Sequence, residues 1–416
     1  MLYIKPIREI VYKDVVDFCD NKNNEGFILE YKRDFPSNSN EALAKTIAAL
    51  ANTYGGILII GVNAPNGEPI PPFEGITFDP NQKYEERIQS IVLSHIKEPV
   101  FPEVKVCEPV SGKTFIVIRV AESHLTPHRV VNNSRIYIRT GQSSTPNAEA
   151  TWDKIEWLAS RRKKSEEFRE FLIKEAETYH QEAFQKLGIN VLGSNYFAIL
   201  TLRILPLFPQ DPMIKYKELE NIEEVIRVKH SIYSFPEIPY PFESVQNGVQ
   251  RLEFARIGNK QHPVEGDSFK YIHLNSFGLY LYKEDIGLLN QQKDQEYRII
   301  SEQKSLNYYW ILISLHQFLK SASQYFKRFG YWGTLLFQTE LFNVLGINMR
   351  HPSSRLTESL ILPRSNLKWE RKFSAVLLQS QITDITTDVM TDVAWSLGAN
   401  SMTDKLIKDY ISINFQ

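Results

Sequence analysis

The stretch Ala51-Asn52-Thr53-Tyr54-Gly55-Gly56 runs directly into Ile57-Leu58-Ile59-Ile60-Gly61-Val62-Asn63. Apolar residues recur at helical spacing before it, from about Asn40 onward. Gly55 can take the left-handed conformation that ends many helices, because it has no Cβ. The apolar run after it does not alternate with polar residues, so we expect a strand that is buried on both faces. The sequence therefore predicts a helix, a glycine turn and a central strand in succession.

Shorter elements are predicted on both sides of this unit. Residues 27–32 alternate as a strand, with Phe27, Leu29 and Tyr31 on one face. A loop over residues 33–40 ends in good N-cap residues, and residues 81–97 show the apolar stripe of a helix. Residues 104–107 and 115–120 are predicted to form a hairpin, and residues 135–139 another strand. This alternation of helices and strands predicts an α/β domain with a mixed sheet over residues 1–147.

The pattern changes beyond this domain. Residues 148–190 are helical and charged, which predicts a connecting segment of one or two long helices. Residues 191–416 are predicted to form a β-rich α+β domain, because aromatic and β-branched residues dominate up to about residue 285. Within this domain, residues 301–326 are predicted to form an amphipathic helix, and residues 384–416 are mostly helical.

The composition restricts the class of protein. The chain has 416 residues, enough for two or three domains, and its net charge is −1, so any binding of nucleic acid requires a local basic patch. Cys19 and Cys107 are the two cysteines, too few for a disulfide scaffold or a cysteine-built zinc site. No apolar run is long enough to cross a membrane, and no signal peptide is recognisable at the N-terminus. These features predict a cytoplasmic protein that has no membrane partner.

Five segments, taken in order, resemble the Schlafen AlbA_2 domain family, also called divergent AAA. Glu25-Gly-Phe-Ile-Leu-Glu30-Tyr31-Lys32 is similar to the family's E-x4-E-F-K strand. The opening stretch is similar to A-N-T-x-G-G-x-L-x-I-G-V-D. The strand that starts at Gly112-Lys113-Thr114 follows, and then Pro127-His128 and the segment from Tyr137 to Gly141. The resemblance covers about residues 20 to 150 and implies a nucleic-acid-binding domain.

The carboxylates of the first segment suggest metal chemistry. Metal-dependent phosphodiesterases hold a divalent cation with carboxylates, and a nearby lysine can stabilise charge at phosphorus. Glu30 and Lys32 share a strand face, whereas Glu25 needs a bend to reach them. In active family members the two glutamates act with an aspartate at a position where this chain has Asn63. The resemblance therefore implies Mg²⁺ or Mn²⁺ at Glu25, Glu30 and Asn63, with cleavage weakened by the missing charge. The alternative is that Glu30 and Lys32 form an ion pair on a solvated strand.

A basic segment follows the third motif. No acidic residue lies between Glu122 and Glu149, and the segment between them includes Arg129, Arg135, Tyr137 and Arg139. Strand alternation predicts that the last three of these project from one face, with two guanidinium groups flanking a ring. Such a face can contact phosphates and stack on a base. The alternative is a solvated strand in which Tyr137 packs under a neighbouring element.

Two further motifs are interpreted as structural. Ser111-Gly112-Lys113-Thr114 is similar to the end of a P-loop, but the pattern G-x4-G-K-S/T requires glycine where Cys107 stands. The residues that follow continue as a strand rather than a helix, so no nucleotide cofactor is expected. The basic run from Arg161 to Lys164 is predicted to be a solvated helix face that pairs with Glu166 and Glu167.

Two hypotheses of function remain open. The first is a protein of a defence or regulatory system that binds RNA or DNA, with or without metal-dependent nuclease activity. The second is a non-catalytic sensor or interaction protein whose C-terminal domain binds a protein or a small ligand. A homodimer or a partner protein bound through the C-terminal half is compatible with both hypotheses.

Overall fold

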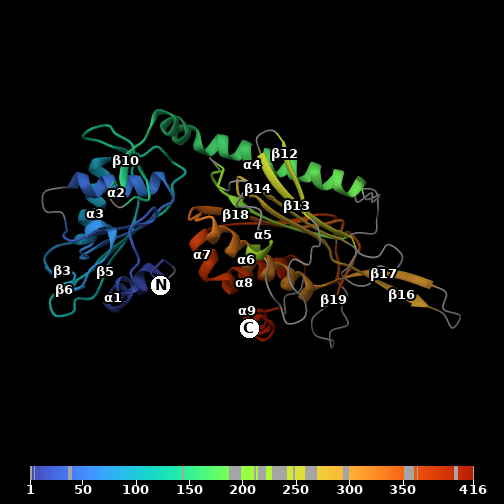
Figure 1. Cartoon of the computed structure of the whole chain (residues 1–416). Coiled ribbons are helices and arrows are strands. Elements are labelled where there is room, and N and C mark those ends of the chain that lie inside the picture. Colours follow the sequence, from blue (N-terminus) through green and yellow to red (C-terminus); the bar gives the residue numbers. More distant parts are fainter. Residues whose placement is uncertain are drawn as a thin grey trace. The chain divides into compact units, whose positions relative to one another are not determined.

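The structure is a computed structural model of the whole chain (Figure 1). It describes residues 2–3, 5–35, 40–142, 145–186, 198–209, 212–213, 222–226, 241–246, 249–257, 269–293, 299–350, 360–362, 364–397 and 402–415. The chain divides into two compact units. The N-terminal unit comprises Met1–Glu166 with Trp332–Thr334, and the C-terminal unit comprises Glu167–Tyr331 with Leu335–Gln416.

A mixed four-stranded sheet forms the centre of the N-terminal unit. Its order is β1 (Leu29–Lys32), β2 (Gly56–Ile60), β7 (Ile116–Val120) and β5 (Glu103–Val106). β1 and β2 are parallel, and helix α2 (Asn40–Asn52) connects them, while the other two pairs are antiparallel. The opening stretch therefore forms the predicted helix, turn and central strand.

Apolar residues cover both faces of this sheet. One face packs against α2 and α3 (Tyr84–His95) through Leu58, Ile60 and their neighbours in β7. The other face packs against the segment that holds α1 (Tyr12–Asp20), through Ile57, Ile59 and Tyr31. Residues 57–60 are at most 1% exposed, which explains why the run lacks polar alternation.

The two glycines allow the helix to end against the edge of the sheet. Gly55 has φ of +72° and its N–H donates to the Leu50 carbonyl at 2.8 Å, as expected for a helix C-terminus. Gly56 has φ of +141°, and a Cβ at this position would lie 2.3 Å from the Ile28 carbonyl oxygen. The close approach of β1 and β2 thus requires glycine at this position.

Three two-stranded ladders complete the unit. They are β3 (Ile76–Thr77) with β6 (Lys113–Thr114), β4 (Ile96–Lys97) with β8 (Arg129–Val130), and β9 (Tyr137–Arg139) with β10 (Asn147–Glu149). The helix predicted over residues 81–97 ends at His95, because Ile96 has extended backbone angles and pairs with Val130. In the predicted hairpin β5 and β7 are paired, and Lys113 and Thr114 form a separate strand beside β3.

Helix α4 (Trp152–Lys186) begins in the N-terminal unit and continues in the C-terminal unit as one uninterrupted helix. The C-terminal unit contains a seven-stranded sheet, whose order is β12 (Pro241–Gln246), β13 (Val249–Ile257), β14 (Phe269–Asn275), β15 (Tyr280–Asp285), β11 (Ile199–Pro206), β18 (Thr334–Phe342) and β21 (Leu367–Ser374). The neighbours from β12 to β18 are antiparallel.

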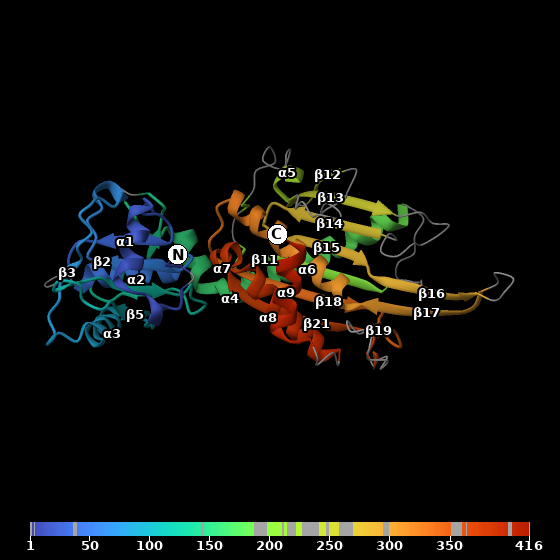
Figure 2. The ribbon, with the colours of Figure 1, turned by 90° about the horizontal axis from the view of Figure 1, so that it is seen from below.

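Helices cover both faces of the seven-stranded sheet. α4 packs on one face through Leu172 and Ala176. α6 (Tyr308–Arg328) packs on the other face, where the ring centroids of Tyr280 and Phe318 are 4.8 Å apart. Figures 1 and 2 show α7 (Ala375–Ser380) and α8 (Ile382–Ser396) on the α6 side. The remaining helices are α5 (Ile222–Ile226) and α9 (Asp404–Asn414). The α+β class predicted from the sequence is confirmed.

One boundary in this unit was predicted wrongly. The amphipathic helix expected over residues 301–326 begins at Tyr308, because residues up to Asn307 belong to strand β17 (Ile299–Asn307). The Asn307 side chain accepts a hydrogen bond from the Tyr309 N–H at 2.9 Å and caps the helix. β17 belongs to a second sheet with β16 (Gly287–Lys293), β19 (Asn348–Arg350) and β20 (Leu360–Ile361). None of the helices described is long and apolar enough to cross a membrane.

Candidate functional site

Glu30 lies on the buried face of β1 and is held by two cations. Its side chain is 1% exposed, one carboxylate oxygen pairs with the Arg139 guanidinium, and the other pairs with the Lys32 ammonium. The Lys32 side chain is 39% exposed, so its charge is partly solvated. Glu30 and Lys32 therefore form the ion pair of the sequence alternative, but the strand is largely buried and not solvated as that alternative had it, and Arg139 is the buried third member.

Arg139 is an internal residue. Its side chain is 0% exposed, and it donates to the Gly26 carbonyl, to the Leu29 carbonyl at 2.8 Å and to the Asn147 side-chain oxygen at 2.9 Å, besides Glu30. Tyr137, two residues earlier on β9, is also buried. The prediction that Arg135, Tyr137 and Arg139 form one open face is therefore wrong. Tyr137 and Arg139 point into the domain, and Arg135 precedes the strand and is exposed.

The Glu25 carboxylate accepts a hydrogen bond from the backbone. Its Oε1 accepts a hydrogen bond from the Tyr31 N–H at 2.7 Å. Burial raises the pKa of the Glu25 carboxyl, and the neighbouring Glu30 charge adds to this, against the lowering effect of the Tyr31 hydrogen bond. Glu25 therefore stabilises the bend that leads into β1.

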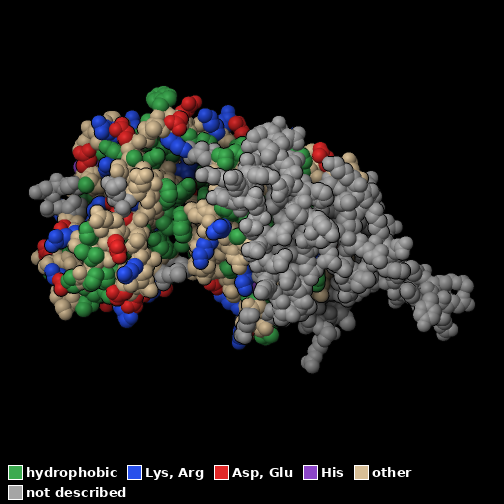
Figure 3. All heavy atoms as spheres, in the orientation of Figure 1, with side chains coloured by type: hydrophobic (Ala, Val, Ile, Leu, Met, Phe, Trp, Pro, Cys, Tyr) green, Lys and Arg blue, Asp and Glu red, His purple; other side chains and the backbone are tan. Residues whose placement is uncertain are grey.

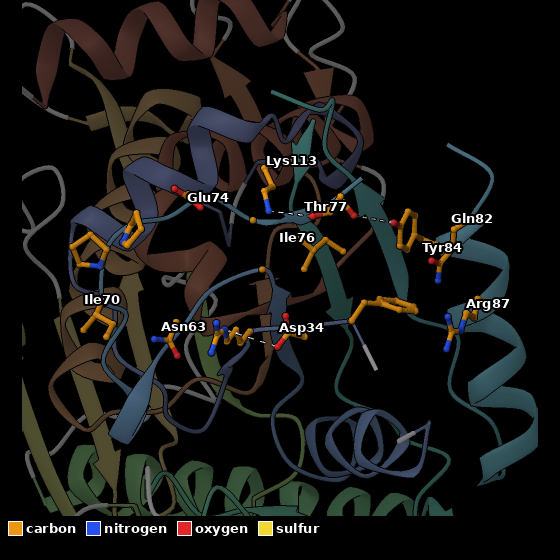
Figure 4. Close-up of a pocket in the computed structure, with 16 residues that line it drawn as sticks. Asp34, Asn63, Ile70, Glu74, Ile76, Thr77, Gln82, Tyr84, Arg87 and Lys113 are labelled. Atoms are coloured by element: carbon orange, nitrogen blue, oxygen red, sulfur yellow. Dashed lines mark hydrogen bonds and ion pairs between the residues drawn. The ribbon is translucent and has the colours of Figure 1, made fainter. Parts of the chain in front are cut away.

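The predicted metal ligands do not fit a divalent cation. Both oxygens of Glu30 are bound by cationic side chains, and a metal ion would have to displace the buried Arg139 guanidinium. Asn63 lines a pocket to which neither Glu25 nor Glu30 contributes (Figure 4). Among the residues that the structure describes, no group of three or more His, Cys, Asp and Glu side chains could hold a metal ion. Mg²⁺ and Mn²⁺ bind through oxygen ligands, and each carboxylate oxygen of Glu30 already accepts from a cationic side chain.

Two residues of the opening stretch hold β8 and β9 in place, a role that spacing alone did not reveal. The buried Asn52 amide donates to the His128 and Tyr137 carbonyls at 3.0 and 2.9 Å, and its oxygen accepts from the His128 N–H. The Thr53 hydroxyl accepts from the Arg139 N–H at 2.9 Å. Asn52 and Thr53 thus position the strand that carries Arg139.

A basic surface lies at the end of the β4–β8 ladder. Lys97 is directly opposite Arg129 in the antiparallel register, and the Val130 N–H donates to the Arg135 carbonyl at 2.9 Å. The side chains of Arg129 and Arg135 are 42% and 56% exposed, and Lys97 is exposed. Because Arg129 pairs with Ile136 and Val130 with Arg135, Arg135 projects from the other side of β8 than Lys97 and Arg129. We call these three exposed cations around β8, Lys97, Arg129 and Arg135, the basic surface. Sequence analysis missed Lys97, because only the pairing of strands brings it to Arg129.

The basic run on α4 is only partly solvated, which corrects the prediction for its first member. Arg161 is 4% exposed and pairs with Glu122. Its guanidinium also donates to the Asn52 and Thr53 carbonyls, at 3.4 and 3.3 Å, where α2 ends. A cation at a helix C-terminus satisfies carbonyls that lack partners within the helix. Arg162 to Lys164 are exposed, as predicted.

Comparisons with known proteins were made for the whole chain. Residues 25–148 match the family model described as Schlafen, AlbA_2. A crystal structure of the DIP2311 protein from Corynebacterium diphtheriae is 21% identical, over 36% of this chain and 32% of that chain, with a TM-score of 0.26. The solution structure of the N-terminal domain of a RecG-related protein from Nitrosomonas europaea is 27% identical, over 27% of this chain and 74% of that chain, with a TM-score of 0.23.

No curated protein matches the chain. The chain spans about a third of the length of the DIP2311 structure. The Glu30 cluster, which consists of Glu30, Lys32 and Arg139, and the basic surface both fall within the segment that matches the family model. The resemblance found in the sequence is thereby confirmed for the N-terminal third of the chain: residues 25–148 are a match to the Schlafen AlbA_2 family.

Proposed function

We propose that the N-terminal unit binds nucleic acid through the basic surface of Lys97, Arg129 and Arg135. The observation that carries this proposal is the placement of Lys97 directly opposite Arg129, where both side chains reach solvent, within the segment that matches the family. Like charges directly opposite each other destabilise an antiparallel pair. A phosphate group between the two side chains removes that repulsion, and Arg135, on the other side of β8, can contact a second phosphate.

Arg129 and Arg135 each lie near an acidic side chain, but these ion pairs are too weak to prevent the arginines from binding phosphate. The Arg129 guanidinium is 4.0 Å from the Glu98 carboxylate, and the Arg135 guanidinium is 3.3 Å from Glu149. All four side chains are at least 42% exposed, and such surface pairs contribute little free energy. On the face of the N-terminal unit in Figure 3, basic and acidic side chains are interspersed, which fits a net charge of −1. The binding should therefore be local and strongly weakened by salt.

The structure supports binding without cleavage. Metal-dependent hydrolysis needs carboxylates that can take up a cation, and the Glu30 carboxylate is already neutralised by Arg139 and Lys32. We therefore assign the Glu30 cluster a structural role in the N-terminal unit. Association of two chains, or with a partner protein, through residues 191–416 stays a prediction, which light scattering of the purified protein tests.

Fluorescence anisotropy with labelled single-stranded and double-stranded RNA and DNA tests the proposal. The full chain should bind at least one of these at low salt, and log Kd should rise linearly with log salt concentration. The double variant Arg129→Ala/Arg135→Ala should weaken binding at least about tenfold and lower the salt slope by about two.

Lys13→Ala is the matched control, since Lys13 is an exposed cation of α1, outside residues 25–148. It should bind like the parent chain. If the parent binds none of the four nucleic acids at low salt, the proposal is wrong. If the double variant binds as tightly as Lys13→Ala, the contact lies elsewhere on the chain.

A further inference from the structure

A pocket of about 580 Å³ lies in the N-terminal unit, and the basic surface is not part of it. Its volume falls within the range of small-molecule sites. Three cationic side chains line it from three different elements: Arg33 directly after β1, Arg87 on α3 and Lys113 on β6. In Figure 4 Lys113, Arg87 and Asn63 stand around the central Ile76 side chain.

Close backbone contacts form one side of the pocket. Gly61 has φ of +108°, and a Cβ there would lie 2.8 Å from the Gly75 Cα. Gly75 has φ of +77°, and a Cβ there would lie 2.3 Å from the Thr114 carbonyl oxygen. The end of β2, the residue before β3 and strand β6 can meet only because neither glycine has a side chain. This contact places Lys113 at the pocket.

The cations are oriented by neighbouring side chains. The Arg87 guanidinium carbon is 4.8 Å from the centroid of the Phe35 ring, a cation–π contact. Phe35 in turn packs edge-on against Tyr84, with centroids 5.3 Å apart. The Lys113 ammonium donates to the Thr77 hydroxyl at 3.1 Å, and Lys113 is only half-buried. An ammonium has three donors, so Lys113 can bind an anion while it keeps this bond.

A buried amide in the pocket points to a ligand that accepts hydrogen bonds. The Gln82 side-chain nitrogen is buried and donates to no residue that the structure describes. A buried donor without an acceptor costs about 1–3 kcal/mol, so such groups in folded proteins usually have a partner. The Asn63 side chain lines the same pocket and is exposed. Donors of this kind can hydrogen-bond the carbonyl and ring-nitrogen acceptors of a base.

We propose that this pocket binds the terminal nucleotide of a strand by its phosphomonoester group, an inference that rests on the proposed function. Such a group carries between one and two negative charges at neutral pH and has three acceptor oxygens. Arg33, Arg87 and Lys113 supply the positive charge for the phosphate. Asn63 and Gln82, which lie on opposite sides of Ile76 in Figure 4, supply polar groups for the nucleoside. The pocket has room for one nucleotide, so a strand enters by its end. A free nucleoside monophosphate offers the same chemistry.

Acidic residues in the pocket limit its charge without cancelling it. Asp34 and Glu74 line it with the three cations. The Asp34 carboxylate is 3.9 Å from the Arg33 guanidinium, and both side chains are more than three-quarters exposed, so the pair is weak. The pocket thus keeps a net positive charge. The expectation that no nucleotide binds concerned a P-loop helix, whereas Lys113 reaches the pocket from a strand.

Binding of matched strands tests the proposal. Single-stranded RNA and DNA of one sequence are labelled internally and carry a 5′-phosphate, a 3′-phosphate or no terminal phosphate. In anisotropy titrations, one phosphorylated form should bind the full chain about tenfold tighter than the strand without terminal phosphate. Arg87→Ala and Lys113→Ala should remove this preference and leave binding of the unphosphorylated strand unchanged. Lys83→Ala removes an exposed cation next to the pocket and should keep the preference.

Each other outcome has a definite meaning. Equal binding of all three strands by the parent overturns the pocket proposal and leaves the basic surface as the binding site. A loss for all strands in Arg87→Ala and Lys113→Ala also overturns it, because the pocket then contacts internal phosphates. If no single strand binds, the proposed function rests on double-stranded RNA and DNA alone, and it fails if these do not bind either. The pocket proposal is then tested by thermal melting with a nucleoside monophosphate. Saturable stabilisation of the parent that Lys113→Ala lacks supports the proposal, and no stabilisation of the parent overturns it.

Discussion

Glu30 and Arg139 lie inside the N-terminal unit, whereas Lys97 and Arg129 lie on its surface, although both pairs fall in the segment that matches the family. The inner pair joins opposite charges and fastens β9 to the segment before β1. The outer pair sets like charges opposite each other across the β4–β8 ladder, and Arg129 makes a solvent-exposed contact with Glu98 at 4.0 Å. Burial and charge together therefore separate arginines that build the domain from arginines that can contact a partner, even when they are ten residues apart in the sequence.

The largest expected effect is on stability. Arg139→Ala leaves the Glu30 carboxylate buried with Lys32 as its only remaining cation and removes donors from the Gly26 and Leu29 carbonyls. Removing one partner of a buried ion pair costs about 3–5 kcal/mol. Urea unfolding should show this loss, and Arg135→Ala should stay within about 0.5 kcal/mol of the parent. Equal effects of the two variants would contradict the distinction between inner and outer arginines.

A charge reversal on the surface should act in the opposite direction. Lys97→Glu puts unlike charges across the β4–β8 ladder, which should stabilise the fold by about 0.2–1 kcal/mol. The same change should weaken binding of nucleic acid at least about tenfold, because a phosphate contact becomes a repulsion. Thermal melting and anisotropy on one preparation measure both effects. A variant that is more stable and still binds like the parent would remove Lys97 from the interface.

A smaller effect on stability, which depends on pH, is expected at Glu25, beside the buried pair of Glu30 and Arg139. Its pKa is raised by burial, so the folded chain binds a proton at a higher pH than the unfolded chain. The protonated carboxyl stabilises the fold below the ordinary pKa, and this contribution is lost as the pH rises through the raised pKa. Glu25→Gln can keep the hydrogen bond from Tyr31 and carries no charge. It should therefore be more stable than the parent at neutral pH, with the difference shrinking in acid.

The smallest effect is expected for metal ions. Adding Mg²⁺ or Mn²⁺ should not produce cleavage of bound strands, and Asn63→Asp should not create it. The reason is that both carboxylate oxygens of Glu30 are already paired with Arg139 and Lys32. From the sequence alone, the resemblance implied a metal site at Glu25, Glu30 and Asn63 whose cleavage is weakened by the missing charge. Gel analysis of a labelled strand with each ion separates these expectations. Metal-dependent cleavage that Glu30→Ala abolishes would contradict this, because it would mean that the metal ion displaces the Arg139 guanidinium from Glu30.

The helix, turn and strand at the centre of the N-terminal unit could be predicted from the sequence, but which of its charged side chains are buried could not. Helix, glycine turn and buried strand follow from the periodicity of residues 40–60 and from Gly55, because these signals are local. Alternation on β9 correctly put Tyr137 and Arg139 on one face, but it does not say which face is buried. That depends on Asn52, Thr53 and Glu30, which lie far away in the sequence and meet β9 only through α2 and β1. Lys97 was missed for the same reason.

Gly56 has a consequence for how this sequence can diverge. A methyl group there would overlap the Ile28 carbonyl, which accepts the first hydrogen bond between β1 and β2. Every other amino acid would force these strands apart, whatever the domain binds. Selection for a folded chain alone is then enough to keep the glycine pair while the surface drifts. A deep mutational scan should find Gly56 intolerant even in a growth assay that reports only abundance, because the fold itself requires this glycine.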